Sequence, residues 1–134
     1  MKHLMITSII LLAGVSGEAM AGCAANAKVT GSALSTLFTG STVCATRGTE
    51  KWQEQHRSGG ALWDYKKGPT DKVDPSKQVG TWSIVGNNIT HSYTGGASYT
   101  YSVHGPNGGP YSFCTGSTEV VSGASITGGL TSCL

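Results

Sequence analysis

Hydrophobic and polar residues alternate along much of the chain after Gly40, which is the pattern of half-buried β-strands. The strongest alternation lies in segments 79–85 and 89–93, which flank Gly86-Asn87-Asn88. Because glycine and asparagine tolerate the positive φ angles of tight turns, this stretch predicts a β-hairpin. Further strands are expected at 42–46, 51–56, 61–66, 98–103 and 110–114, with one or two more between 119 and 127 split near Gly123.

One face of these predicted strands is largely aromatic or aliphatic, and the opposite face is mostly serine and threonine. The residues expected on the inner face are Trp82, Ile84, Ile89, His91, Tyr93, Tyr99, Tyr101, Val103, Tyr111 and Phe113. Such alternation suits a sheet with one solvated face. Seven to eight short strands at a spacing of about ten residues predict an all-β fold, a small antiparallel meander barrel or tight sandwich.

Two segments depart from the alternation. In segment 32–39, Leu34, Leu37 and Phe38 have helical spacing, which predicts one short N-terminal helix that Ser32 caps and Gly40 ends. Segment 68–78 combines two prolines with polar turn-forming residues and predicts a surface loop.

The first 21 residues have the pattern of a secretory signal peptide. A basic start at Lys2 precedes an apolar stretch, and Ala19-Met20-Ala21 matches the A-x-A cleavage pattern. The apolar stretch is shorter than the roughly 20 residues of a spanning helix. We therefore expect residues 1–21 to be removed and residues 22–134 to form a single domain. That domain would be periplasmic or extracellular, with no transmembrane segment after cleavage.

A lipid anchor is the alternative to a soluble exported form. Met20-Ala21-Gly22-Cys23 resembles the lipobox that precedes the lipidated cysteine of bacterial lipoproteins. Lipidation of Cys23 would leave an odd number of cysteines in an oxidising compartment. Both forms are exported.

All four cysteines follow the predicted signal peptide, and an even number in an exported chain favours two disulfides. Four cysteines allow three connectivities, among which the sequence does not choose. Because the ends of compact domains are often close together, we expect nested bridges, Cys23–Cys133 outside Cys44–Cys114. The chain has no C-x-x-C motif, which argues against a thioredoxin-like redox centre or a zinc knuckle.

The net charge of +2 is weak, and the lysines around Lys66 and Lys72 alternate with aspartates. Nucleic-acid binding needs clustered basic residues that face phosphates, so no nucleic-acid partner is expected.

Part of the chain resembles small exported bacterial barrels of the lipocalin-like and avidin-like type. The resemblance is carried by Gly80-Thr81-Trp82, the turn at 86–88 and the Tyr99/Tyr101 pair. It implies a meander barrel and at most a cavity. The G-x-W motif of lipocalins lies on the first strand, whereas here it comes late in the chain, and no arginine is placed to stack on the tryptophan. No binding residue is therefore carried over.

Segment 52–65 has the most unusual composition, because it concentrates two tryptophans among polar side chains. Ligand pockets combine aromatic walls with a few polar groups. Our hypothesis is a ligand site formed by Trp52, Gln53, His56, Trp63, Tyr65 and His91. In the alternative interpretation the tryptophans belong to the core and the glutamines face water.

The spacing of ionisable residues gives less support to a metal site or to catalysis. Glu54 and His56 share a strand face, but a three-ligand site would need His56, His91 and a carboxylate to converge. By strand parity, His91 and His104 point to opposite faces. The chain contains neither G-x-S-x-G nor H-E-x-x-H. We therefore expect no metal, no cofactor and no enzymatic activity.

These observations favour a non-enzymatic, monomeric binding module for a small molecule, a glycan or another protein. The alternatives are a structural or surface-associated protein without its own ligand, and a small hydrolase.

Overall fold

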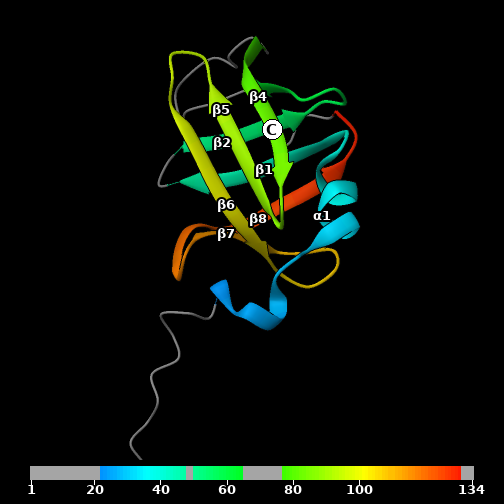
Figure 1. Ribbon diagram of the computed structural model, residues 1–134, viewed down its shortest axis with the longest axis vertical. Coiled ribbons are helices and arrows are strands. Elements are labelled where there is room, and N and C mark those ends of the chain that lie inside the picture. Colours follow the sequence, from blue (N-terminus) through cyan, green and yellow to red (C-terminus); the bar gives the residue numbers. More distant parts are fainter. Residues whose placement is uncertain (1–21, 48–49, 65–76, 131–134) are drawn as a thin grey trace, which may run out of the picture.

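The computed structural model describes residues 22–47, 50–64 and 77–130, so the predicted signal peptide lies outside the described residues. The described chain forms a closed barrel of eight antiparallel strands in sequence order (Figure 1). The strands are β1 (Ser41–Arg47), β2 (Glu50–His56), β3 (Ala61–Asp64), β4 (Lys77–Val85), β5 (Asn88–Tyr93), β6 (Ser98–His104), β7 (Tyr111–Thr115) and β8 (Thr118–Gly128). Pairing of β1 with β8 closes the sheet, which confirms the predicted meander and selects the barrel over the sandwich.

The inward faces of the strands build the core. Its buried hydrophobic residues on the strands are Val43, Leu62, Trp82, Ile89, Val103, Tyr111, Phe113, Val121 and Ala124. This agrees with the predicted inner faces at most positions. Tyr99 differs, since half of it (50%) is exposed. It is the second residue of β6, next to the turn that joins β5 to β6, so it lies near one rim of the barrel.

One short helix, α1 (Gly31–Phe38), packs against β1 and β8 and buries Leu34 and Phe38 completely (Figure 1). The predicted cap at Ser32 is wrong, because the helix begins one residue earlier and its N-cap residue makes no side-chain capping bond. Instead, the Gly31 N–H donates to Oδ1 of Asn87, in the β4–β5 turn, at 2.9 Å. This bond satisfies an otherwise unpaired donor of the first helical turn and ties the helix to the hairpin.

The predicted break near Gly123 is a β-bulge within one continuous strand, β8. Gly123 has φ +64°, and Val121 and Ala124 are both buried although they are three residues apart. On the neighbouring strand their partners, Phe113 and Tyr111, are only two apart. One extra residue on β8 therefore shifts the alternation without ending the strand.

The predicted hairpin is confirmed, with Ile84 opposite Ile89 across the β4–β5 turn. The predicted loop over 68–78 is wrong at its last two positions, because Lys77 and Gln78 begin β4. The remainder of that loop lies outside the described residues.

The predicted nested disulfides are wrong, because Cys23 is bonded to Cys114, with a Cα–Cα distance of 6.0 Å. Cys44 is also disulfide-bonded, and Cys133 lies outside the described residues. The cause of the actual pairing is the path of the N-terminal segment, which includes the short helix η2 (Ala25–Ala27). It runs along β6, where Val29 N–H donates to Val103 O and Gly105 N–H donates to Ala27 O. This path brings Cys23 to β7.

The Cys23–Cys114 bridge also bears on the lipid-anchored alternative. Lipidation needs the sulfur of Cys23, and that sulfur is bonded to Cys114. The disulfide-bonded form is therefore incompatible with a lipid on Cys23.

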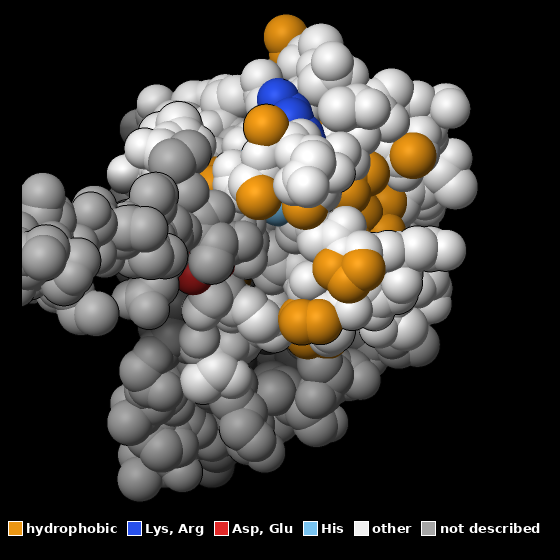
Figure 2. All heavy atoms as spheres, turned by 90° about the horizontal axis from the view of Figure 1, so that it is seen from below, with side chains coloured by type: hydrophobic (Ala, Val, Ile, Leu, Met, Phe, Trp, Pro, Cys, Tyr) orange, Lys and Arg blue, Asp and Glu red, His pale blue; other side chains and the backbone are white. Residues whose placement is uncertain are grey.

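No helix among the described residues is long and apolar enough to cross a membrane. On the face seen in Figure 2, the described surface is mostly uncharged, with scattered hydrophobic side chains and one small group of Lys or Arg atoms. This sparse charge agrees with the sequence, of which 12% is Asp, Glu, Lys or Arg.

Candidate metal centre

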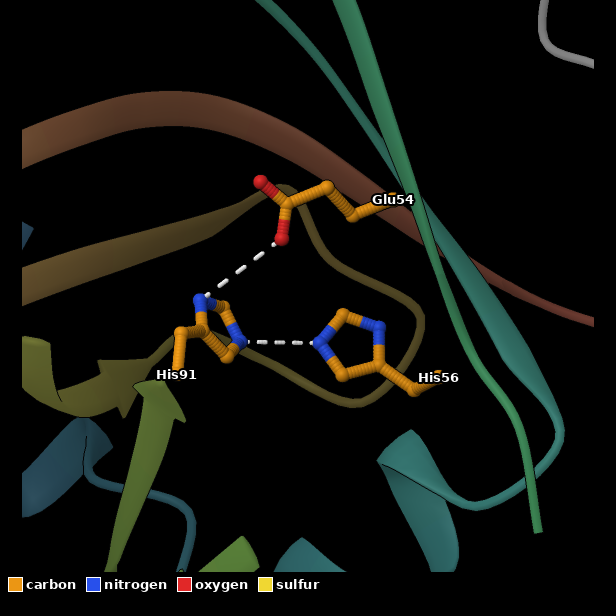
Figure 3. Close-up of side chains that lie close together, drawn as sticks. All are labelled: Glu54, His56 and His91. Carbon is orange, nitrogen blue, oxygen red and sulfur yellow. Dashed lines mark hydrogen bonds and ion pairs between the residues drawn. The ribbon is translucent and has the colours of Figure 1, made fainter. Parts of the chain in front are cut away.

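Three ionisable side chains meet inside the barrel: Glu54 and His56 from β2, and His91 from β5 (Figure 3). Glu54 and His56 are two residues apart, so both point to the inner face of β2. His91 pairs with the core residue Trp82 across β4 and β5. Since β2 and β5 are not neighbours in the sheet, the cluster depends on closure of the barrel.

His91 lies between the other two side chains of this Glu54–His56–His91 cluster (Figure 3). Its Nε2 is 2.9 Å from Nε2 of His56, and its Nδ1 is 3.7 Å from Oε2 of Glu54. When one donor atom is taken from each residue, all three atoms lie within 4.8 Å of one another. None of the three residues is more than 2% exposed.

The surroundings of the cluster are apolar on one side and polar on the other. The ring of Phe38, from α1, meets the His56 ring edge-on with ring centroids 4.9 Å apart. The ring of Trp82 also meets the His56 ring edge-on, with ring centroids 5.5 Å apart. At the carboxylate, the hydroxyl of Tyr93 donates to Oε1 of Glu54 at 2.7 Å. The helix therefore covers the histidine end, and a phenol orients the carboxylate.

Burial keeps both histidines of the cluster neutral at pH 7. Desolvation lowers the pKa of His91 from 6.5 to about 4. Desolvation, followed by the charge of His91, lowers the pKa of His56 well below its ordinary value. Neutral imidazole has one ring nitrogen with a free lone pair, which is the form that ligates metal ions.

The pKa of Tyr93 is raised, first by burial and then by the charge of Glu54. The phenol therefore stays protonated and continues to donate its hydrogen bond to the carboxylate. A carboxylate held in this way keeps its second oxygen, Oε2, directed at His91.

The spacing of the imidazole nitrogens suits a shared ion. With metal–nitrogen bonds of about 2.0–2.1 Å, two ligating nitrogens lie about 2.9 Å apart at a right angle and about 3.3 Å apart in a tetrahedron. The observed separation between Nε2 of His56 and Nε2 of His91 is 2.9 Å. In the metal-free protein this contact is a hydrogen bond between the two rings, so an ion would replace the shared proton and the rings would turn until both lone pairs point at it. Nδ1 of His91 then faces Glu54, which either binds the ion or accepts the N–H and orients the ring.

The structure brings together only part of the predicted ligand site. His56 and His91 meet, but Gln53 and Trp63 lie on the opposite strand faces from His56 and Leu62. The indole of Trp63 instead lies under the guanidinium of Arg57, 3.8 Å from the ring centroid. The side chains of Trp52 and Tyr65 lie outside the described residues.

Glu54 belongs to the cluster and Tyr93 contacts it, although neither was among the predicted ligand residues. From the sequence we expected that a metal site would need His56, His91 and a carboxylate to converge. A local signal was present in Glu54-x-His56, which places two ligand types on one strand face. The sequence pattern could not predict that side chains of β2 and β5 meet across the barrel, because this contact depends on barrel closure.

His104 is buried but lies apart from the cluster, on the outer face, as strand parity predicts. Its Nδ1 is 2.7 Å from the carbonyl oxygen of Ala24, and its Nε2 is 2.9 Å from Oγ of Ser102. The N-terminal segment covers it. His104 is therefore the natural control for substitutions of the cluster histidines.

The fold and the cluster together define the class of protein, a closed eight-stranded β-barrel with a buried Glu-His-His constellation. The chain matches no protein-family model, no curated protein and no solved structure. Its chemistry must therefore be inferred from its own residues.

Acid should destabilise the metal-free protein through the cluster histidines. The folded pKa of His91 is about 4, below the value of about 6.5 in an unfolded chain. As the pH falls below about 6.5, the unfolded chain therefore binds protons first. The contribution of neutral His91 to the free energy of unfolding is complete above about pH 6.5. It is lost by about pH 4, where the free energy of unfolding is lower by about 3 kcal/mol.

Urea unfolding between about pH 7.5 and pH 4 measures this loss. His91→Gln removes one of the titrating groups and should flatten the pH dependence of the unfolding free energy. An unchanged slope in His91→Gln would contradict a buried neutral His91.

Proposed function

We propose that this chain is an exported β-barrel protein that binds one divalent first-row transition-metal ion through His56, His91 and Glu54. The observation that carries the proposal is the meeting of two imidazole Nε2 atoms, 2.9 Å apart, with a carboxylate inside the barrel. Imidazole is a preferred ligand of zinc and copper, and a carboxylate completes a donor set typical of such ions.

Burial favours an ion over an organic ligand. The three donor side chains are at most 2% exposed, and Phe38 and Trp82 pack against His56. A bare ion needs only to replace the hydrogen bond between the two imidazoles, whereas a sugar or a cofactor would have to displace the packed side chains. The proposal keeps the predicted binding module but replaces the expectation of no metal with one bound metal ion.

A polar approach to the donors is available at the carboxylate end. Asp64 lies opposite Glu54 in the β2–β3 ladder, and both acids raise the pKa of Tyr93. Asp64 is only partly buried. Two carboxylates near one another attract cations, so this end of the cluster is the favoured entry for the ion.

Metal-dependent hydrolysis is a second candidate, because catalytic zinc sites also use three protein ligands and leave one position for water. We favour binding without turnover, since none of the three donors is exposed to a substrate. Turnover of ester or phosphoester substrates by the zinc-loaded protein, lost in His91→Gln, would favour the enzyme.

Export is supported by two features. The first 21 residues carry the signal-peptide pattern. The Cys23–Cys114 disulfide is of a kind that persists in oxidising compartments.

Isothermal titration of the metal-stripped, disulfide-bonded protein tests the proposed function. We expect one Zn²⁺ per chain, tighter binding of Cu²⁺ in accordance with the Irving–Williams order, and no measurable binding of Mg²⁺. His104→Gln should bind like the wild type. Absence of binding for all transition metals tested would refute the proposal. The remaining candidates would then be a module that binds another kind of ligand and a structural protein without a ligand.

A further inference from the structure

Gly22 lies against the outer surface of the barrel, beside Glu119 of β8 and Ser112 of β7. A Cβ atom on Gly22 would overlap Oε2 of Glu119 and would lie 3.1 Å from Oγ of Ser112. Ser112 Oγ donates to the same carboxylate oxygen at 2.6 Å. A side chain at position 22 would therefore displace the carboxylate and break this hydrogen bond.

The same geometry places the backbone nitrogen of Gly22 close to the carboxylate. The nitrogen and the Cβ position are each one bond of about 1.5 Å from the Cα atom of Gly22, so they lie close to each other. Because the Cβ position overlaps Oε2 of Glu119, the nitrogen lies within about 4 Å of that oxygen. Nitrogen and oxygen at that separation form an ion pair when both are charged.

Neighbouring contacts hold Gly22 in this position. Cys23 is bonded to Cys114 of β7, and the carbonyl oxygen of Gly22 lies 3.6 Å from Sγ of Cys114. The next residue, Ala24, accepts the contact from His104. The backbone of Gly22 is thus held beside Glu119 by a covalent bridge and by packing on β6 and β7.

We propose that this surface is a binding site for the α-ammonium group that signal-peptide cleavage creates at Gly22. Hydrolysis by a signal peptidase adds water across the Ala21–Gly22 bond. The hydroxyl forms the carboxyl group of Ala21, and the nitrogen of Gly22 becomes a protonated amine. That charge then pairs with Glu119, on the oxygen that Ser112 also contacts. This proposal is independent of the metal centre and depends on the predicted cleavage after Ala21.

The ion pair has a direct consequence for the pKa of the new amine. An unperturbed α-amino group titrates at about 7.7–8.0, and a nearby carboxylate favours its charged form. We expect the pKa of the Gly22 amine to be raised by a few tenths of a unit, as suits a pair at the surface. Glu119→Gln keeps the shape of the side chain but removes its charge, so it should return the pKa to the ordinary value.

The experiment uses the full precursor, expressed in a bacterial host that exports it. Intact mass and N-terminal sequencing give the first residue of the recovered protein, and an NMR titration of labelled glycine gives the pKa of its amine. We expect a start at Gly22, a raised pKa in the wild type, and an ordinary pKa in Glu119→Gln. The control Lys77→Gln changes an exposed charge on β4 and should leave the pKa at its wild-type value.

Three results would overturn the proposal. They are a mature chain that starts at another residue, a lipid mass on Cys23, and a Gly22 pKa that is the same in the wild type and in Glu119→Gln. Circular dichroism on each variant shows whether the barrel is folded during the titration.

Discussion

His91→Gln is expected to weaken zinc binding at least a thousandfold, while the barrel stays folded at neutral pH. His91 lies between the other two donors, 2.9 Å from His56 and 3.7 Å from Glu54. Its removal therefore takes away one of the three donors and leaves Glu54 and His56 as the remaining pair, with donor atoms within 4.8 Å of each other. A thousandfold loss corresponds to about 4 kcal/mol of binding free energy, which is a reasonable cost for losing the central ligand of three.

His104→Gln is the matched control for this loss, because it makes the same chemical change at a histidine on the outer face. Competition titration with a chromophoric chelator measures both affinities, and far-ultraviolet circular dichroism checks folding. If His91→Gln kept wild-type affinity, or if His104→Gln lost it equally, the cluster would not be the binding site.

Removing the Cys23–Cys114 bridge is expected to produce the largest loss of stability, about 4–5 kcal/mol. The two cysteines are 91 residues apart in sequence. In the chain-entropy model, closing a loop of that length restricts the unfolded chain by an amount equivalent to that loss. A small domain is stable by only about 5–15 kcal/mol, so the double variant Cys23→Ser/Cys114→Ser should be marginally folded.

Urea unfolding under non-reducing conditions compares this double variant with the wild type. Replacing both cysteines avoids a free thiol that would exchange with other bridges. The bridge joins the N-terminal segment to the barrel, while the metal donors lie on the inner faces of β2 and β5. In conditions where the variant is folded, its zinc affinity should therefore stay within about threefold of the wild type. An unchanged unfolding midpoint would contradict the expected stabilisation.

Much of the fold could be predicted from the sequence because it is a meander. Each strand pairs with the next in sequence, so alternation and turn residues such as Gly86 and Asn87 determine most of the pairing. Features that depend on distant segments were not predictable in this way. The Cys23–Cys114 bridge depends on the N-terminal segment lying along β6, and the helix start depends on Asn87.

The candidate site shows the same division. Alternation put His56 on the same face as Glu54, and put His91 on an inner face. Our hypothesis grouped Gln53 and Trp63 with His56, but in the structure they lie on the strand faces opposite His56 and Leu62. The distance between His56 and His91, however, is a property of the closed barrel, since β2 and β5 are separated by β3 and β4 on the shorter path around the sheet. Their low pKa values follow from burial in that interior.

The most direct test of a metal centre inside the barrel is an anomalous-difference map from crystals grown with Zn²⁺, recorded at the zinc absorption edge. We predict a peak inside the barrel, at bonding distance from Nε2 of His56 and Nε2 of His91, with Glu54 as a third ligand or in contact with His91. A map with no peak inside the barrel, or with zinc only on the outer face near His104, would contradict the account.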